Sequence, residues 1–140
     1  MGRESRRKAE NRVAKGKMWK IDLRPYDVEI AQVGDDGRVE MEKGKPVMVT
    51  DDFDVKGSMA SILFNQELKL NVDESFQAKD LADKIRGSNT HVLVDGAELG
   101  KLQAAYKIVK GIPEQQLEFF ARIRDVKEVE VKEAVAEEAG

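Results

Sequence analysis

The carboxylates near position 52 form the densest group of side chains in this chain that could carry out chemistry. Asp51, Asp52 and Asp54, joined by Asp73 from further along, would offer the oxygen ligands that a hard cation prefers. The group lacks the regular ligand spacing of a calcium-binding loop, and an aspartate just before a helix also caps that helix. We therefore expect helix capping here and predict no metal site.

The only histidine, His91, is the second candidate for catalysis. A histidine that acts as a general base needs an oriented carboxylate nearby, and Asp95 is the only local candidate. Alternation over residues 90–94 instead favours a surface or packed histidine on a strand. The chain has no cysteine, which excludes disulfides, thiolate metal sites and a cysteine nucleophile. These observations predict a protein that is not an enzyme and needs no cofactor.

Residues 1–17 are strongly basic, with seven cationic side chains against two glutamates. The segment has few apolar residues, so we expect a mobile arm. Arginine and lysine neutralise phosphates, which makes the arm a candidate nucleic-acid contact, whereas the lack of interleaved aromatic residues favours a solvated tail. The candidate nucleic-acid-binding residues are Arg3, Arg6, Arg7, Lys8, Arg12, Lys15 and Lys17.

Three aromatic residues are candidates for a protein interface. Trp19, the only tryptophan, follows the basic arm directly and either covers the edge of the core, which we favour, or anchors a partner. Phe119 and Phe120 are adjacent, and two neighbouring side chains cannot both enter one narrow seam of a helix. We expect one of them to be buried and the other to meet another subunit.

The elements that must position these residues begin with strands. Trp19, Ile21 and Leu23 alternate with polar residues, and the alternation shifts after Pro25, which indicates a bulge or bend. Turn signals at 34–37 and 43–46 separate two further short apolar alternations. Three strands joined by short turns predict an antiparallel meander from about residue 18 to 50 with one covered face.

Helical patterns dominate the rest of the chain. Apolar residues at helical spacing predict a helix from Val55 that Asp52 or Asp54 caps, and three more helices over about 74–86, from Asp95 to Gly111, and after Pro113. Thr90 to Val94 indicates a fourth strand. We therefore predict one α+β domain over residues 18–131, a small antiparallel meander followed by about four helices, between flexible charged termini: the basic arm, 1–17, and an acidic tail, 132–140.

No apolar run approaches the length of about 20 residues that spans a bilayer, and no apolar stretch of the secretory kind follows the basic start. We expect a soluble, unexported protein without membrane contact.

Four stretches resemble small accessory proteins of tailed bacteriophages: DVKGSMASILFNQELKLN, DLADKI, HVLVDGAELGKLQAAYKIVKG and LEFFARI. The resemblance covers roughly residues 18 to 131, and no functional residue can be transferred from it. It implies a small non-enzymatic protein that binds other phage proteins, as a structural or accessory component of an assembly, in the host cytoplasm or the virion. The leading prediction is thus a protein–protein interaction module that forms an oligomer or docks on a larger assembly. The alternative is a nucleic-acid-binding protein that uses the basic arm.

Overall fold

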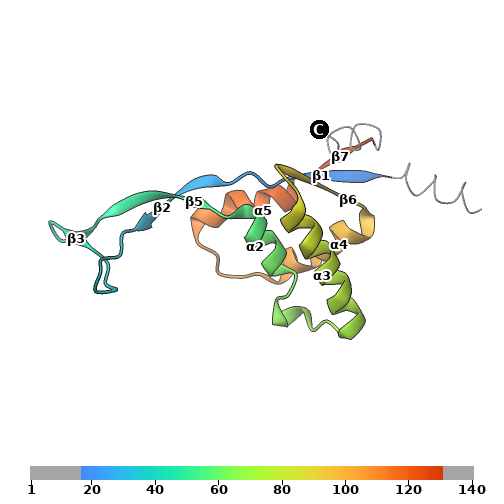
Figure 1. The fold of residues 1–140 in the computed structure, drawn as a ribbon, viewed down its shortest axis with the longest axis horizontal. Helices are drawn as coiled ribbons and strands as arrows, with labels where there is room; N and C mark the ends of the chain where they lie inside the picture. Colours follow the sequence, from blue (N-terminus) through green and yellow to red (C-terminus); the bar gives the residue numbers. More distant parts are fainter. Residues whose placement is uncertain (1–16, 131–140) are drawn as a thin grey trace, which may run out of the picture.

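The computed structural model describes residues 17–130. The predicted acidic tail and all of the basic arm except Lys17 lie outside this range, so their predicted roles stay predictions. In the described part, a central antiparallel sheet has the strand order β6-β1-β7 (Figure 1). Its strands are β1, Met18–Asp22, β6, His91–Val94, and β7, Lys127–Val129.

The apolar alternation in β1 explains why this strand is the middle of the sheet. Ile21 lies opposite Val92 of β6, and both side chains are almost fully buried. On the other side of β1, Met18 lies opposite Val129 of β7. The sheet therefore joins the two ends of the described chain.

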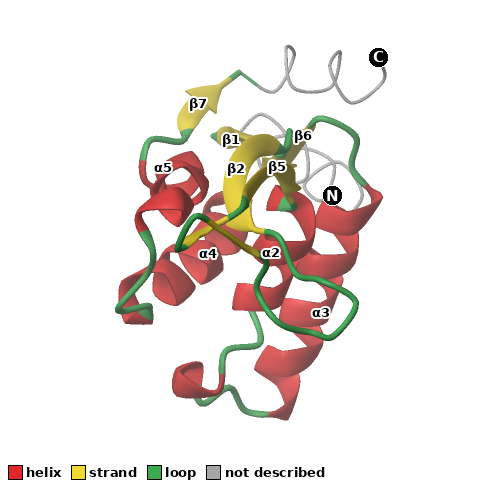
Figure 2. Ribbon diagram, turned by 90° about the vertical axis from the view of Figure 1, so that its left-hand side faces the viewer, coloured by secondary structure: helices red, strands yellow, loops and turns green. Residues whose placement is uncertain are grey.

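Residues 17–130 contain four α-helices, which lie together below the strands in Figure 2. Their bounds are α2, Val55–Ile62, α3, Val72–Gly87, α4, Gly96–Ile108, and α5, Leu117–Arg124, with short 3₁₀ turns η1, Gln66–Leu68, and η2, Glu114–Gln116. Asp54 caps α2, and α3 and α4 each begin with a capping box, formed by Asn71 with Glu74 and by Asp95 with Glu98. The predicted α+β class, with antiparallel strands and four helices, is confirmed.

A second, separate strand pair leaves the core. β2, Tyr26–Ala31, pairs with β5, Met48–Phe53, in antiparallel register, and the small hairpin β3, Met41–Glu42, with β4, Lys45–Pro46, lies at the tip. We call residues 26–53 the ribbon. It projects from the helical body as a long arm, on the left in Figure 1.

The strands are therefore not packed as one meander over residues 18–50. β1 pairs with β6 and β7, which come from much later in the chain, while β2 pairs directly with β5. Leu23 donates its backbone N–H to Thr90 O at 2.8 Å, so the pairing continues one residue beyond β1 and β6 before the chain enters the ribbon at Tyr26. Apolar partners for β1 come from the run His91–Val94, because the ribbon is too polar to cover it.

Candidate functional site

The base of the ribbon is fixed to the core by stacked aromatic rings. Tyr26 of β2 and Phe53 of β5 lie directly opposite each other, with ring centroids 5.1 Å apart and planes inclined by 16°. Phe53 in turn contacts Phe119 of α5, with centroids 5.5 Å apart. This stack joins both strands of the ribbon to the buried core.

Hydrogen bonds to the segment before α5 hold the ribbon at its base. The Tyr26 hydroxyl donates to Gln115 O at 2.6 Å and accepts from the backbone N–H of Phe119 at 3.2 Å. Burial of the ring raises the pKa of this hydroxyl, so it remains a donor at neutral pH.

The side chain of Gln115 also binds the backbone of the ribbon. Its Oε1 accepts from Glu29 N–H at 2.9 Å, and its Nε2 donates to Glu29 O at 2.7 Å. One primary amide thus satisfies both backbone groups that Glu29 directs away from β5, as a neighbouring strand would. The edge of β2 is covered at this point.

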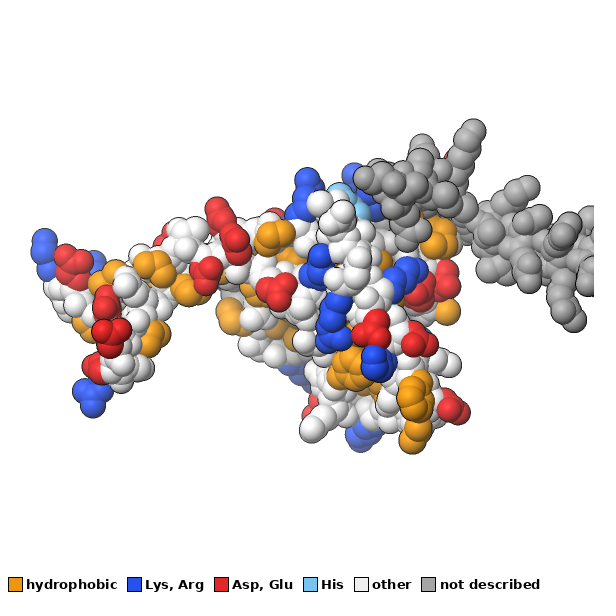
Figure 3. Space-filling view, viewed as in Figure 1, with side chains coloured by type: hydrophobic (Ala, Val, Ile, Leu, Met, Phe, Trp, Pro, Cys, Tyr) orange, Lys and Arg blue, Asp and Glu red, His pale blue; other side chains and the backbone are white. Residues whose placement is uncertain are grey.

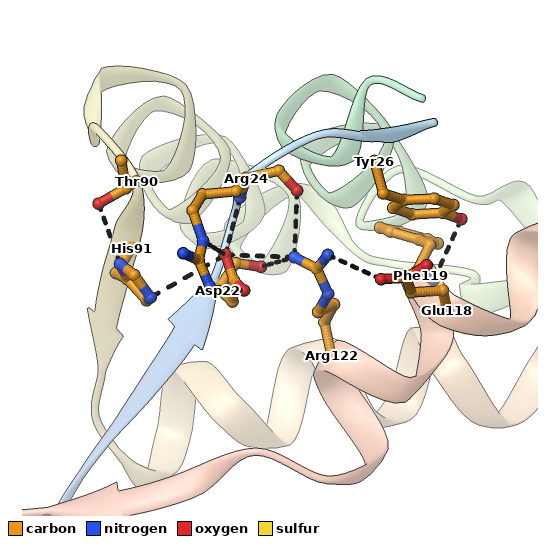
Figure 4. Close-up of polar contacts among 8 residues, drawn as sticks. All are labelled: Asp22, Arg24, Tyr26, Thr90, His91, Glu118, Phe119 and Arg122. Atoms are coloured by element: carbon orange, nitrogen blue, oxygen red, sulfur yellow. Dashed lines mark hydrogen bonds and ion pairs between the residues drawn. The ribbon is translucent and has the colours of Figure 1, made fainter. Parts of the chain in front are cut away.

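An ion-pair network fixes the connection between β1 and the ribbon (Figure 4). Asp22 accepts two hydrogen bonds from the Arg24 guanidinium, at 3.0 and 2.9 Å, and lies 3.2 Å from Arg122 Nη1. The same Arg122 nitrogen donates to the carbonyls of Asp22 and Arg24, both at 3.1 Å. Arg122 also lies over the Tyr26 ring, 5.7 Å from its centroid. The network therefore ties α5 to β1 and β2.

Asp22 is the most strongly perturbed acid of the network. The hydrogen bond from Arg24 is the main cause that lowers its pKa from 3.8 to about 2, and the charge of Arg122 acts in the same direction. Its carboxylate is paired with these two cations, so the arrangement links α5 to the segment that leads into the ribbon.

The ribbon itself has two different faces. Along one face, Ile30 of β2 lies opposite Val49 of β5, next to the pair of Val28 and Asp51. Along the other face lie Asp27 opposite Asp52, and Glu29 opposite Thr50. Over residues 26–53 there are eight acidic and three basic side chains. The ribbon is thus amphipathic and acidic.

Beyond the base, apolar side chains of the ribbon are exposed. Five of them are between 41% and 59% exposed: Ile30, Val33, Val39, Met41 and Met48. Figure 3 shows apolar patches along the arm between acidic side chains. We call this set the apolar residues of the ribbon.

A smaller apolar depression lies at the other end of the helical body. A cavity of about 220 Å³ between η1, α3 and α4 is lined mainly by leucine and alanine, with Glu74 and Lys101 among its lining residues. Phe64 and Phe76 are exposed as well, at 43% and 65%. This region and the ribbon are distinct surfaces.

The predicted interface residues are placed differently from the expectation. Phe119 and Phe120 are both buried, with 2% and 7% exposed, so the prediction that one of them meets another subunit is wrong. α5 has apolar neighbours on two sides, because Phe119 packs on Phe53 and Phe120 packs on Tyr106 of α4. Trp19 is partly buried against the core, which is the packing role that we favoured.

The candidate catalytic and metal-binding residues are dispersed or already engaged. His91 Nε2 lies 3.9 Å from Asp22 Oδ1, whereas Asp95, the carboxylate nearest in sequence, caps α4. Asp51 and Asp52 occupy successive positions of β5 and so point to opposite faces. Within residues 17–130, no three His, Asp or Glu side chains are arranged to hold a metal ion.

Sequence reasoning missed the residues that position the ribbon, Tyr26, Gln115 and Arg122. The available signal was the acidic composition of 27–52 next to isolated apolar residues, which is unsuitable for a sheet buried under helices.

Among the described residues, every helix is too short or too polar to cross a membrane. Comparisons with protein-family models, with curated proteins and with solved structures found no match.

Proposed function

We propose that this protein is a non-enzymatic protein–protein interaction module, a component or accessory factor of a phage-like assembly, in the host cytoplasm or the virion. The observation that carries the proposal is the ribbon, which projects from the core with five large apolar side chains exposed. The phage context is supported by the resemblance of residues 18–131 to accessory proteins of tailed phages.

Energetics favour a partner for the ribbon. A two-stranded ribbon has little stability of its own in water, and exposed apolar groups add none. Covering one half-exposed valine or methionine contributes about 1 kcal/mol. Five such side chains lie along one arm, with Ile30 and Met48 on opposite faces of it, and a protein that covers several of them gains several kcal/mol: Ile30, Val33, Val39, Met41 and Met48.

The fixed base of the ribbon supports the same function. An arm that must be ordered on binding loses affinity through conformational entropy, whereas a preorganised arm does not. The Tyr26–Phe53 stack, the Gln115 amide and the Arg122 network order the root of the ribbon before any partner arrives. Because these contacts hold both strands at the base of the ribbon, they support a role in which the arm is presented to a partner.

The alternative function rests on the charge of residues 1–17. Seven basic side chains there favour contact with nucleic-acid phosphates. Deleting residues 1–17 should then abolish salt-sensitive binding to DNA or RNA, while substitutions in the ribbon leave that binding unchanged. Equal binding by the deleted and the full chain would remove this alternative.

The experiment for the leading proposal compares two matched variants. The ribbon variant carries Ile30→Ser and Val33→Ser, and the control carries Phe64→Ser and Phe76→Ser, which remove equally exposed apolar residues from the helical body. Molar mass by light scattering, at low and high salt, and pull-down from lysate are measured for each. We expect the ribbon variant to lose an oligomer or a captured protein that the control retains. A monomer at both salt concentrations, with identical proteins captured by all three chains, would overturn the proposal.

A further inference from the structure

We infer that the outer edge of β5 binds an extended basic segment of a partner protein as a third strand of the ribbon. The inference rests on the proposed function and names the partner's chemistry. It follows from a difference between the two edges of the ribbon and from the charges on its two faces.

The edge of β2 is occupied. In an antiparallel pair, alternate residues direct both backbone groups toward the partner strand or away from it. Glu29 directs both groups away from β5, and the Gln115 side chain binds both of them, at 2.9 and 2.7 Å. Gln115 thus stands where a third strand would otherwise begin on this side.

The edge of β5 is open by the same rule. Thr50 lies opposite Glu29, so its backbone N–H and C=O also point outward, on the opposite edge. Within residues 17–130, the outward backbone groups of Thr50 have no hydrogen bond of the kind that Gln115 makes to Glu29. The next outward amide, that of Asp52, is bound by the Asp51 carboxylate at 2.8 Å. The free edge is therefore centred on Met48 to Thr50.

The faces of the ribbon specify the side chains of the added strand. Residues of that strand alternate between two faces of the ribbon. The face with Ile30 and Val49 is apolar apart from Asp51, and the face with Glu29 and Asp52 is acidic. Two residues that face each other across neighbouring strands stabilise the pair when their charges differ in sign and destabilise it when their charges have the same sign. The matching segment thus alternates apolar residues with lysine or arginine.

A second copy of β5 is a poorer occupant. If two β5 strands paired with each other at Thr50, Asp51 and Asp52 of both copies would lie in the same interface. Each ribbon contributes eight acidic against three basic side chains, so the combined sheet would be strongly acidic. Charge repulsion therefore disfavours pairing between copies and favours a basic partner.

The probe is a soluble, end-blocked octapeptide of alternating valine and lysine, labelled with a fluorophore, and its binding to the full chain is followed by anisotropy. The control peptide has the same composition with the valines and the lysines in two blocks. We expect the alternating peptide to bind at least tenfold more tightly. Equal affinity for both peptides would show charge attraction without strand addition and would overturn the inference.

Proline substitutions distinguish the two edges. Thr50→Pro removes the outward N–H of β5, and Asp27→Pro removes an outward N–H of β2, two residues before Glu29. Thr50→Val keeps the N–H and loses only the hydroxyl that donates to Glu29 at 3.3 Å. We expect a tenfold or greater loss of affinity from Thr50→Pro alone. An equal loss from Asp27→Pro, or full binding by Thr50→Pro, would overturn the inference.

Amide hydrogen exchange of the unsubstituted chain provides a readout that does not depend on the folding of variants. Bound peptide should slow exchange at Thr50 at least tenfold and leave Glu29, whose amide is already bonded, unchanged. Unchanged exchange at Thr50 would overturn the inference. If the serine variant of the ribbon loses its partner while the peptide does not bind, the open-edge inference fails and the proposed function stands.

Discussion

Gln115 and Glu29 are 86 residues apart in the chain, yet one side-chain amide binds both outward backbone groups of Glu29. The contact uses two hydrogen bonds to attach a strand to the turn that precedes α5. The contact uses only backbone atoms of Glu29. Its carboxylate lies on the acidic face, where it accepts from the Thr50 hydroxyl at 3.3 Å, so different atoms of one residue attach the ribbon and set its surface charge.

The Tyr26 hydroxyl is a second attachment point, and its removal should loosen the ribbon. Tyr26→Phe deprives the carbonyl of Gln115 and the amide of Phe119 of a partner. We expect the free energy of unfolding to fall by about 1 kcal/mol in urea titrations. The control is Tyr106→Phe, whose hydroxyl has no hydrogen bond in the described chain, with an expected change within about 0.5 kcal/mol. Equal losses would contradict this role of Tyr26.

Acid should weaken the fold through Asp22. Its pKa is about 2 in the folded protein and 3.8 without its partners, so the folded state favours the ionised form. The resulting stability is fully present above pH 4 and is lost as the pH falls through about 2. Because the carboxylate is partly solvated, we expect a contribution of about 1 kcal/mol.

Unfolding by urea between pH 2 and pH 6 measures this contribution. In the Asp22→Asn variant, the free energy of unfolding should change less with pH over this range. Asp125→Asn removes an exposed partner of Arg124 and serves as the control, with a profile close to that of the unsubstituted chain. A profile of Asp22→Asn that keeps the full slope would assign the acid sensitivity to other groups.

The two buried phenylalanines of α5 should matter for stability rather than for association. Phe119→Ala and Phe120→Ala each leave a cavity and should cost about 3–5 kcal/mol on unfolding. Phe76→Ala removes a ring that is 65% exposed and should change stability by less than about 0.5 kcal/mol. Thermal and urea unfolding of the three variants would test this. A small loss for either α5 variant would contradict the packing described.

The effect of Gly57→Ala on stability should depend on the neighbouring residue Asp54. Alanine in a helix is favoured over glycine by about 1 kcal/mol. At position 57, however, a β-carbon would overlap the Asp54 carboxylate, which caps α2 through Gly57 N–H at 2.9 Å. Loss of a cap costs about 1 kcal/mol, so we expect Gly57→Ala alone to be nearly neutral.

The double-mutant cycle isolates this coupling. When Asp54→Ala is already present, no carboxylate remains to be displaced, and Gly57→Ala should then stabilise the protein by about 1 kcal/mol. Equal effects of Gly57→Ala with and without Asp54 would show that the two residues do not interact.

Local features of the fold could be predicted, because their signals lie within a few residues. The cap at Asp54, the helix after Asp95 and the strand at His91–Val94 each have their pattern in one short stretch. The partner of β1 could not be predicted in this way, because alternation shows that a strand has a buried face but not which strand covers it. The burial of both Phe119 and Phe120 likewise depends on the wedge between α4 and the ribbon base.

The site itself was harder to predict than the helices. Gln115 has no local signature, since a glutamine before a helix is ordinary until a strand edge lies beside it. The acidic residues of the ribbon invited a search for metal ligands, although alternation along β5 separates Asp51 from Asp52. Asp52 lies with Asp27 and Glu29 on the acidic face, and Asp51 lies on the opposite face.

The pairing of Met18 with Val129 places the entry and the exit of the described chain side by side, at the end of the molecule away from the ribbon (Figure 1). A tether or a second binding event at either terminus would therefore leave the arm unobstructed. Under the proposed function, a partner bound to the ribbon and anything attached near the ends of β1 and β7 would lie at opposite ends of the folded core.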